Sequence, residues 1–327
     1  MAKFPRRRLL HLVAGATVLP PLLSRIVYAQ SYPSRPVHII VGLAAGSAAD
    51  IMARLIGQSL SERLGKPFVI ENRTGAGGSL AAEAVARASP DGYTLLLNGS
   101  QDAVTATVYQ KLNYNFIRDL APVASIASGP LVLVVNPSFP ARTVPEFIEY
   151  AKANPGMINF GSAGIGTVAQ MAGELFKAMA GVNLVHVPYK GMAQALNDLL
   201  GGQVQAAFST MPPAIGHIKS GRLRALAVTS KARYEALPDL PTIGDFLPGY
   251  EASFTVGLSA PKSVAVEIIE KLNKETNAIL AEPSMKVRLA DLGGEPIAMS
   301  PADFGKLLAD EAEKWAKVVR TANIKPE

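Results

Sequence analysis

The sequence predicts an α/β protein of two lobes, each built on a mostly parallel sheet flanked by helices. Three stretches carry this prediction, because each joins an apolar run, a small-residue loop and a helical pattern: Val37–Gly65, Pro67–Ala88 and Ile158–Ala180. Strands that alternate with helices indicate parallel pairing. Two further apolar segments, Val123–Val135 and Ala252–Ser259, are expected to cross between the lobes.

The first stretch begins with Val37–Val41, a β-branched run typical of a strand buried on both faces. Apolar residues then recur at helical spacing up to Leu64, and Gly65 is a stop signal. Ser47 followed by Asp50 is a capping signature. A structural cap is the favoured role of Asp50, and contact with a ligand ammonium or an ordered water is a compatible alternative. Free N–H groups at this helix start would form a corner for an anion.

The remaining elements follow the same patterns of apolar runs, caps and turn residues. Further strands are expected at Pro67–Glu71, Tyr93–Leu97, Ile158–Phe160, Leu184–Val187, Val204–Ser209 and Leu223–Thr229. One helix is expected to run from Ser79, as its cap, to Ala88, and another from the Thr143 and Glu146 capping box to Ala153. Two more are expected to end at Ala180 and at Gly201-Gly202. The last three are expected at Ala214–Lys219, Val264–Leu280 and Pro301–Val319, the final one capped by Ser300 with Asp303.

Residues 1–29 have the pattern of a cleaved secretory leader: a basic start, a short apolar stretch at Leu9–Leu23, and small residues at Val27-Tyr28-Ala29. Arg6-Arg7 also resembles a twin-arginine signal, so the export route stays open. The leader holds five of the 32 basic residues and no acidic one, which leaves 27 against 26 and a net charge of +1 instead of +6. The basic pI is therefore no evidence for nucleic acid. An exported chain without cysteine fits a bacterial periplasm.

Several function classes lack their signatures. Gly164-Ile165-Gly166 followed by Ala169 matches the dinucleotide pattern, but positions 184–190 hold no acidic residue for a ribose. Neither glycine loop ends as a phosphate-binding P-loop does. The histidines after the leader, at 38, 186 and 217, have no metal-binding spacing, and Ser162 lacks the first glycine of a nucleophile elbow. We therefore expect no enzyme, no metal and no cofactor.

Hydroxyls and backbone amides remain at the predicted helix starts. Ser47, Ser79, Ser162 and Thr167 lie at or near them, and such donors suit a carboxylate. Ordinary helix capping would explain each residue singly. Three glycine-bearing corners of one kind favour a binding site.

Four segments then resemble the Bug family, the extracytoplasmic solute receptors of tripartite tricarboxylate transporters. They are VIENRTGAGGSLAAEAVARASPDGYTLLL, NPGMINFGSAGIGT, HVPYKGMAQALNDLLGGQVQAAF and GRLRALAVTSKARYEALPDLPTIGDF, in collinear order over nearly the whole mature chain. The resemblance implies a two-lobed type II periplasmic-binding-protein fold with two crossover strands. It implies residues 30–128 plus 255–327 in lobe 1 and 129–254 in lobe 2.

The resemblance also implies a small carboxylate held between the lobes by two loops, with ordered waters. Carried onto this chain, the ligand-binding residues are Leu43, Ala44, Ala45, Gly46, Ser47 and Asp50 in the first loop, and Ser162, Ala163, Gly164, Gly166 and Thr167 in the second, with Ser79, Gln101, Tyr189 and Met211 as neighbours. The first loop lacks the family's usual prolines, Gln170 stands where a histidine is common, and Phe254 where a tryptophan is common. The pocket is therefore expected to be reshaped.

The expected function is that of a non-enzymatic periplasmic receptor, monomeric, which closes on a small organic carboxylate and delivers it to membrane permease subunits. Closure would be a hinge motion in the crossover segments. One alternative is a periplasmic sensor that docks on a signalling kinase. Another is an enzyme acting on a carboxylated substrate, which the missing nucleophile–base pair disfavours.

Overall fold

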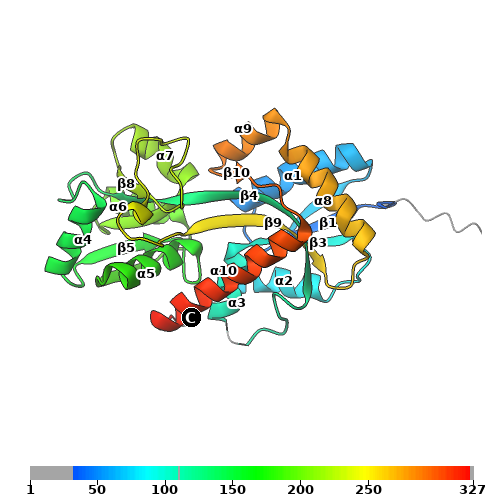
Figure 1. Ribbon diagram of the computed structural model, residues 1–327, viewed down its shortest axis with the longest axis horizontal. Helices are drawn as coiled ribbons and strands as arrows, with labels where there is room; N and C mark the ends of the chain where they lie inside the picture. Colours follow the sequence, from blue (N-terminus) through cyan, green and yellow to red (C-terminus); the bar gives the residue numbers. More distant parts are fainter. Residues whose placement is uncertain (1–31, 110, 325–327) are drawn as a thin grey trace, which may run out of the picture. The chain divides into compact units, whose positions relative to one another are not determined.

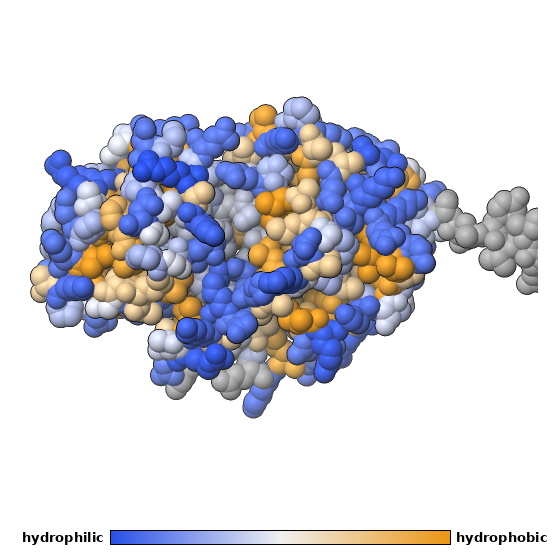
Figure 2. Space-filling model, viewed as in Figure 1, coloured by the Kyte–Doolittle hydropathy of each residue, from blue (hydrophilic) through white to orange (hydrophobic). Residues whose placement is uncertain are grey.

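The computed structural model describes residues 32–109 and 111–324 (Figure 1). The predicted leader, residues 1–29, lies outside this part of the chain. No helix among the described residues has the length and apolar character needed to cross a bilayer. Polar residues cover most of the face seen in Figure 2, and apolar residues form small separate patches there.

Three parallel strands form one end of the sheet, in the order β2-β1-β3. They are β1 (Val37–Val41), β2 (Phe68–Asn72) and β3 (Thr94–Gly99). Ile40 packs in the core on one face, whereas Ile39 and Val41 pack on the other, as expected when successive side chains alternate. The predicted strand buried on both faces is confirmed.

Helices cover both faces of this half of the sheet. On the side of Ile39 the core takes residues from α1 (Ala48–Leu64), α8 (Val266–Leu280) and α9 (Pro283–Asp291). On the side of Ile40 it takes them from α2 (Ser79–Ala86), α3 (Ser100–Val108) and α10 (Pro301–Thr321). Gly65 ends α1 with φ 71°, the left-handed conformation that glycine adopts without strain.

A second set of parallel strands, β6-β5-β7, forms the other half. Its strands are β5 (Ile158–Ser162), β6 (Leu184–Pro188) and β7 (Ala206–Thr210), with β8 (Arg224–Val228) paired to the crossover strand, and its helices are α4 (Val144–Ala153), α5 (Val168–Ala180), α6 (Met192–Leu200) and α7 (Met211–Lys219). Its core is aromatic: Phe176 lies edge-on to Phe147 and to Tyr250. Such edge-to-face pairs stabilise a packed core.

Two antiparallel strands, β4 (Leu120–Val135) and β9 (Ser253–Pro261), join the halves. β4 pairs with β9 through Pro130 and with β7 and β8 from Leu131 onward. Figure 1 shows this strand running from one half into the other. Both crossovers expected from the sequence are therefore present, within a two-lobed α/β fold.

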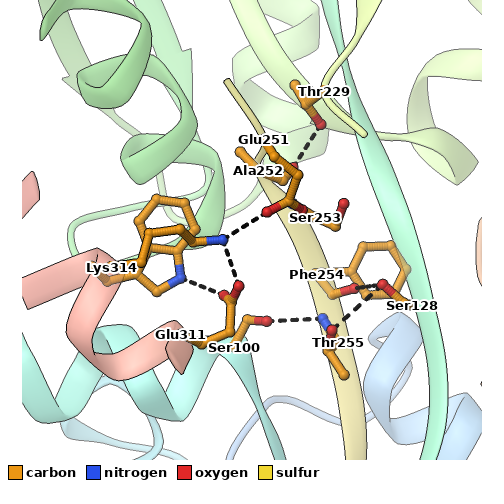
Figure 3. A network of polar contacts seen from close by, with 11 residues as sticks. Ser100, Ser128, Thr229, Glu251, Ala252, Ser253, Phe254, Thr255, Glu311 and Lys314 are labelled. Atoms are coloured by element: carbon orange, nitrogen blue, oxygen red, sulfur yellow. Dashed lines mark hydrogen bonds and ion pairs between the residues drawn. The ribbon is translucent and has the colours of Figure 1, made fainter. Parts of the chain in front are cut away.

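A buried polar network holds the chain where the strands change partners (Figure 3). The Thr229 hydroxyl donates to the Ala252 carbonyl at 2.6 Å and accepts from the Leu131 N–H at 2.7 Å, so it ties both crossovers together. Nearby, Lys314 of α10 forms an ion pair with Glu251 at 3.0 Å and another with Glu311. The C-terminal helix is thereby fastened to the start of β9.

Some elements differ from the sequence-based expectation. Helix α3 follows β3 without a loop, and it was not predicted; nor were α9, the short strand β10 (Glu295–Pro296), or the 3₁₀ turns η1 (Ala76–Gly78) and η2 (Ile243–Asp245). The predicted Ser79 cap is wrong, because Gly78 occupies the N-cap and the Ser79 hydroxyl donates back to the Ala76 carbonyl. No side chain of the described residues caps α2, and the N–H of Ser79 bonds instead to the Ala76 carbonyl of the η1 turn.

Candidate functional site

A small cavity of about 40 Å³ lies at the carboxyl ends of β1 and β3, where α1, α2 and α3 begin. In open α/β sheets, ligands bind in this position beyond the strand ends. Most of its lining is glycine and apolar side chains, with two polar side chains on α3 and two more, Asn98 and Thr255, on the strands. The lining residues are Val41, Gly42, Leu43, Ala49, Gly77, Gly78, Leu97, Asn98, Gly99, Gln101, Asp102, Thr255 and Val256.

Close backbone approach explains the glycines. A Cβ on Gly42 would lie 2.8 Å from the Cα of Gly78, and one on Gly99 would lie 1.7 Å from the Thr255 carbonyl oxygen. Both distances are shorter than side-chain packing permits. The first loop, the η1 turn and the crossover strand β9 therefore meet here through bare backbone.

Asp50 braces the first loop. Its Oδ2 accepts hydrogen bonds from the Gly46 N–H and the Arg54 Nε at 2.9 and 3.0 Å, and its Oδ1 accepts from the Arg54 Nη2 and the Asn72 Nδ2, both at 3.0 Å. Burial favours the neutral acid, but these donors outweigh it and lower the pKa of Asp50. With four donors on two oxygens, this carboxylate positions the loop.

The predicted Ser47 cap is present, since the Ser47 hydroxyl accepts from the Asp50 N–H at 3.3 Å. The return bond of a capping box is different: the Asp50 carboxylate accepts from Gly46 and not from Ser47. Asn72, at the end of β2, adds a second brace by donating to the Leu43 carbonyl at 2.9 Å. The loop is thus held at both ends despite lacking proline.

The second loop is built in a similar way. Thr167 caps α5, because its hydroxyl accepts from the Gln170 N–H at 3.3 Å while donating to the Gly164 carbonyl at 2.7 Å. The Gln170 side chain in turn accepts from the Gly166 N–H at 2.8 Å. Gly164 and Gly166 have positive φ angles of 129° and 74°, which favour glycine. The buried amide of Gln170 therefore shapes this loop.

Ser162 forms a contact that sequence reasoning missed. Its hydroxyl lies 2.7 Å from His186 Nε2, and it also bonds both the N–H and the carbonyl of Gly164. Burial, together with the nearby Lys177, lowers the pKa of His186 to about 4. Ser162 is fully buried, and no carboxylate bonds His186 in the described chain. The pair therefore lacks the orienting third group of a nucleophilic triad.

One hydrogen bond joins α3 to the second loop. The Gln101 Nε2 donates to the Gly166 carbonyl at 2.7 Å, across 65 residues of sequence. Gln101 also lines the cavity at the strand ends. The structure thus brings the second loop beside the first-half cavity, at a side chain that the sequence analysis named only as a neighbour.

The other predicted site residues lie as follows. Ala44, Ala45 and Gly46 are exposed on the first loop, and Ala163 is half-buried on the second. Ser79 is buried and outside the cavity lining. Tyr189 donates its hydroxyl to Asp198 at 2.7 Å. Met211 is 3% exposed and packs in a core cluster with residues of α6 and β7, so its side chain serves packing.

Of the site residues predicted singly, Leu43 and Gln101 line the cavity, and the lining residues that were not predicted as site residues are Val41, Gly42, Gly77, Gly78, Leu97, Asn98, Gly99, Asp102, Thr255 and Val256. A signal for Asp102 was present, because an acid three residues after Gly99 at a strand end is typical of the first turn of a helix. The approach of Gly99 to Thr255 joins positions far apart in the sequence. No local pattern predicts such a contact.

The electrostatics of the cavity depend on backbone groups. No lysine or arginine lines it in the described part of the chain, and no cluster of metal-binding side chains occurs there. The starts of α1, α2 and α3 supply N–H groups and the positive ends of helix dipoles. When the Asp102 carboxyl in the lining is neutral, the site can thus accept an anionic group through hydrogen bonds alone.

Two larger grooves lie elsewhere. One of about 810 Å³ runs between Tyr234 and helices α8 and α9, and one of about 700 Å³ lies beside Glu251 at the network of Figure 3. Neither is lined by the glycine-rich strand ends. The strand-end cavity is therefore the better candidate for recognition of an anion.

Comparison with known proteins identifies the family of this chain. A family model described as the tripartite tricarboxylate transporter family receptor matches residues 52–324. Protein BugT of Bordetella pertussis is 36% identical over 316 residues, which cover 96% of this chain and 97% of BugT. A protein from the TAR-I ttuE-ttuC' intergenic region of Agrobacterium vitis is 38% identical over 320 residues, covering 96% and 91% of the two chains.

Solved structures of similar proteins give the same result. A structure from R. palustris with adipate has a TM-score of 0.81 at 36% identity, covering 90% of this chain and all of that one. MatC from Rhodopseudomonas palustris with bound malate has a TM-score of 0.77 at 32% identity, covering 88% and 100%. These relatives are solute-binding receptors and not enzymes. This chain belongs to the tripartite tricarboxylate transporter receptor family, the Bug family of periplasmic solute-binding proteins.

Proposed function

We propose that this protein is an extracytoplasmic receptor that binds a small organic carboxylate between its lobes and delivers it to a tripartite tricarboxylate-type permease. The observation that carries the proposal is the cation-free, glycine-lined cavity where α1, α2 and α3 begin, with Gly166 of the second loop bonded to Gln101 at its wall. Carboxylates bind well to such groups of backbone N–H donors.

The lobes would be residues 30–128 plus 255–327 and residues 129–254. In support, β4 changes partners between Pro130 and Leu131, and β9 begins at Ser253. A hinge at these positions would let the second loop approach the first, and it would bury the ligand. Thr229, bonded to both crossovers, would be the pivot of that motion.

Two relatives support a carboxylate ligand, since one was solved with adipate and another with malate. Delivery to a permease is supported by the family, whose model describes transporter receptors. A periplasmic location fits both the family and the predicted leader, whose residues lie outside the described part.

Mass spectrometry of small molecules released from the purified protein, with a thermal-shift screen of carboxylates, tests the proposal. An unmodified acid that raises the melting temperature is the expected result, because a ligand that binds only the folded state stabilises it. Stabilisation by no carboxylate, or steady conversion of one into product, would overturn it.

A further inference from the structure

A buried acid without a cationic partner lines the strand-end cavity. Asp102, in the first turn of α3, is 8% exposed. Its Oδ2 accepts a hydrogen bond from the Gly99 N–H at 2.9 Å. Its Oδ1 receives no side-chain or loop hydrogen bond from the described residues, and a Cβ on Gly78 would lie 3.7 Å from it. One carboxylate oxygen thus lies among the cavity glycines with no hydrogen bond from any other described residue.

The surrounding elements provide no cation for Asp102. β3, β9 and η1 carry no titratable side chain. The buried Tyr114 hydroxyl interacts electrostatically with Asp102, but a neutral phenol supplies no positive charge to balance a carboxylate. Among the charged groups on the helices packed against α3, Glu83 pairs with Arg87, Glu174 with Lys177, Glu311 with Lys314 and Lys306 with Asp310, while Asp303, Glu313, Lys317 and Arg320 of α10 are exposed to solvent.

Burying an ionised carboxylate in this way costs free energy unless a hydrogen-bond donor or a cation binds to it. Burial raises the pKa of Asp102 to about 7, although the N–H groups of Gly99 and of Asp102 itself oppose the rise. Near neutral pH the side chain therefore exists in both protonation states. A partner that donates to Oδ1 would favour the charged form, and an added anion would favour the neutral one.

We propose that Asp102 selects carboxylates that also carry a hydrogen-bond donor, an ammonium or a hydroxyl, next to the carboxylate. This inference rests on the proposed function and defines the ligand class of the same site. The ligand carboxylate would bind the N–H groups at the helix starts, and its donor would bind Oδ1 of Asp102. An unsubstituted acid would leave that oxygen unpaired and place a second negative charge beside it.

Matched acids that differ only in one substituent test this inference. Calorimetric titration would compare succinate with L-malate and L-aspartate, and adipate with L-2-aminoadipate, so that two chain lengths are covered. We expect the donor-bearing acid of at least one set to bind about tenfold more tightly than its unsubstituted partner. The hydroxyl and ammonium acids separate a neutral donor from a cationic one.

The pH dependence gives a second readout on the unaltered protein. Between about pH 6 and pH 8.5, affinity for an amino acid should rise with pH, because its ammonium pairs with ionised Asp102. Affinity for the unsubstituted acid should fall over the same range, because its binding requires Asp102 to take up a proton. Equal slopes for both ligands would overturn the inference.

Asp102→Asn removes the charge and places an amide in the same volume. This variant should bind the unsubstituted acid at least as tightly as the parent at pH 8 while losing the tenfold preference, so retained binding also reports folding. Asp291→Asn, at an exposed acid on α9, is the matched control and should keep the preference. If the unsubstituted acids bind as tightly as their partners in the parent, the inference fails while the proposed function stands. If no acid binds, both fail.

Discussion

The Gln101 side chain donates a 2.7 Å hydrogen bond to the Gly166 carbonyl and so connects the start of α3 to the loop before α5. The Gly166 N–H is bonded to Gln170. Both backbone groups of Gly166 are thereby engaged, which makes this glycine the point where the second loop is joined to α3. In the proposed function, this bond would couple closure of the lobes to ligand binding.

Replacing Gln101 should therefore weaken binding. Gln101→Ala removes the part-buried hydrogen bond between α3 and the second loop, worth about 1 kcal/mol, and we expect affinity for the best carboxylate of the screen to fall about fivefold. Isothermal titration calorimetry measures it. Gln203→Ala, on an exposed loop, is the control and should bind as the parent does. Unchanged affinity for Gln101→Ala would show that the bond does not contribute to the bound state.

Asp50 should contribute to stability in a pH-dependent way. Asp50→Asn loses the paired bonds from Arg54 and should lower the free energy of unfolding by about 2 kcal/mol, measured with urea at pH 7. The folded pKa is lowered, so this contribution is present above the ordinary pKa of an aspartate and disappears as pH falls through the folded value. Asp310→Asn, from an exposed pair with Lys306, should cost at most about 0.5 kcal/mol. Equal costs for both variants would contradict this account.

Gly99 should not tolerate a side chain. In Gly99→Ala the new methyl would meet the Thr255 carbonyl and push β3 from β9, so we expect a loss of about 3 kcal/mol or more. Thermal unfolding followed by circular dichroism tests it. Gly216→Ala, in α7 with open space around it, should leave the melting temperature unchanged or raise it. A Gly99→Ala protein as stable as the parent would refute the close approach.

Lys314 should stabilise the fold through the network of Figure 3. Lys314→Ala leaves the buried Glu311 with the Trp315 N–H as its remaining side-chain partner, and we expect a cost of about 2 kcal/mol in urea unfolding. Lys317→Ala, at an exposed lysine of the same helix, should change stability by at most about 0.5 kcal/mol. Indistinguishable variants would mean that the network adds nothing to stability.

His186 should make the protein sensitive to mild acid. Its folded pKa of about 4 lies below the ordinary 6.5, so the unfolded chain binds more protons between these values and stability falls as pH drops through that window. His186→Phe keeps a ring against Phe160 and removes the titration. Between pH 7.5 and pH 5, the parent should lose about 2 kcal/mol more than the variant. Equal losses in urea titrations at the two pH values would contradict the assignment.

Much of the fold could be predicted from the sequence, because hydrophobic period and caps act locally. The strand Val37–Val41, the stop at Gly65 and the Ser300 cap with Asp303 are present as predicted. Helix α3 was missed because it begins directly after β3, and the junction holds the small and polar residues 99–102, which have the pattern of a loop. The two loops of the site were predicted as segments, since their glycines and hydroxyls are local signals.

Only the tertiary structure decided which of those residues meet. The sequence by itself determined the α/β class, the two crossovers and the corners at the starts of α1 and α5. It did not determine that Asp50 is saturated by Arg54 and Asn72, that Met211 packs in a core, or that Asp102 lines the cavity. The physical reason is that each of these depends on long-range packing of strands, whereas sequence patterns report a residue's neighbours within a few turns.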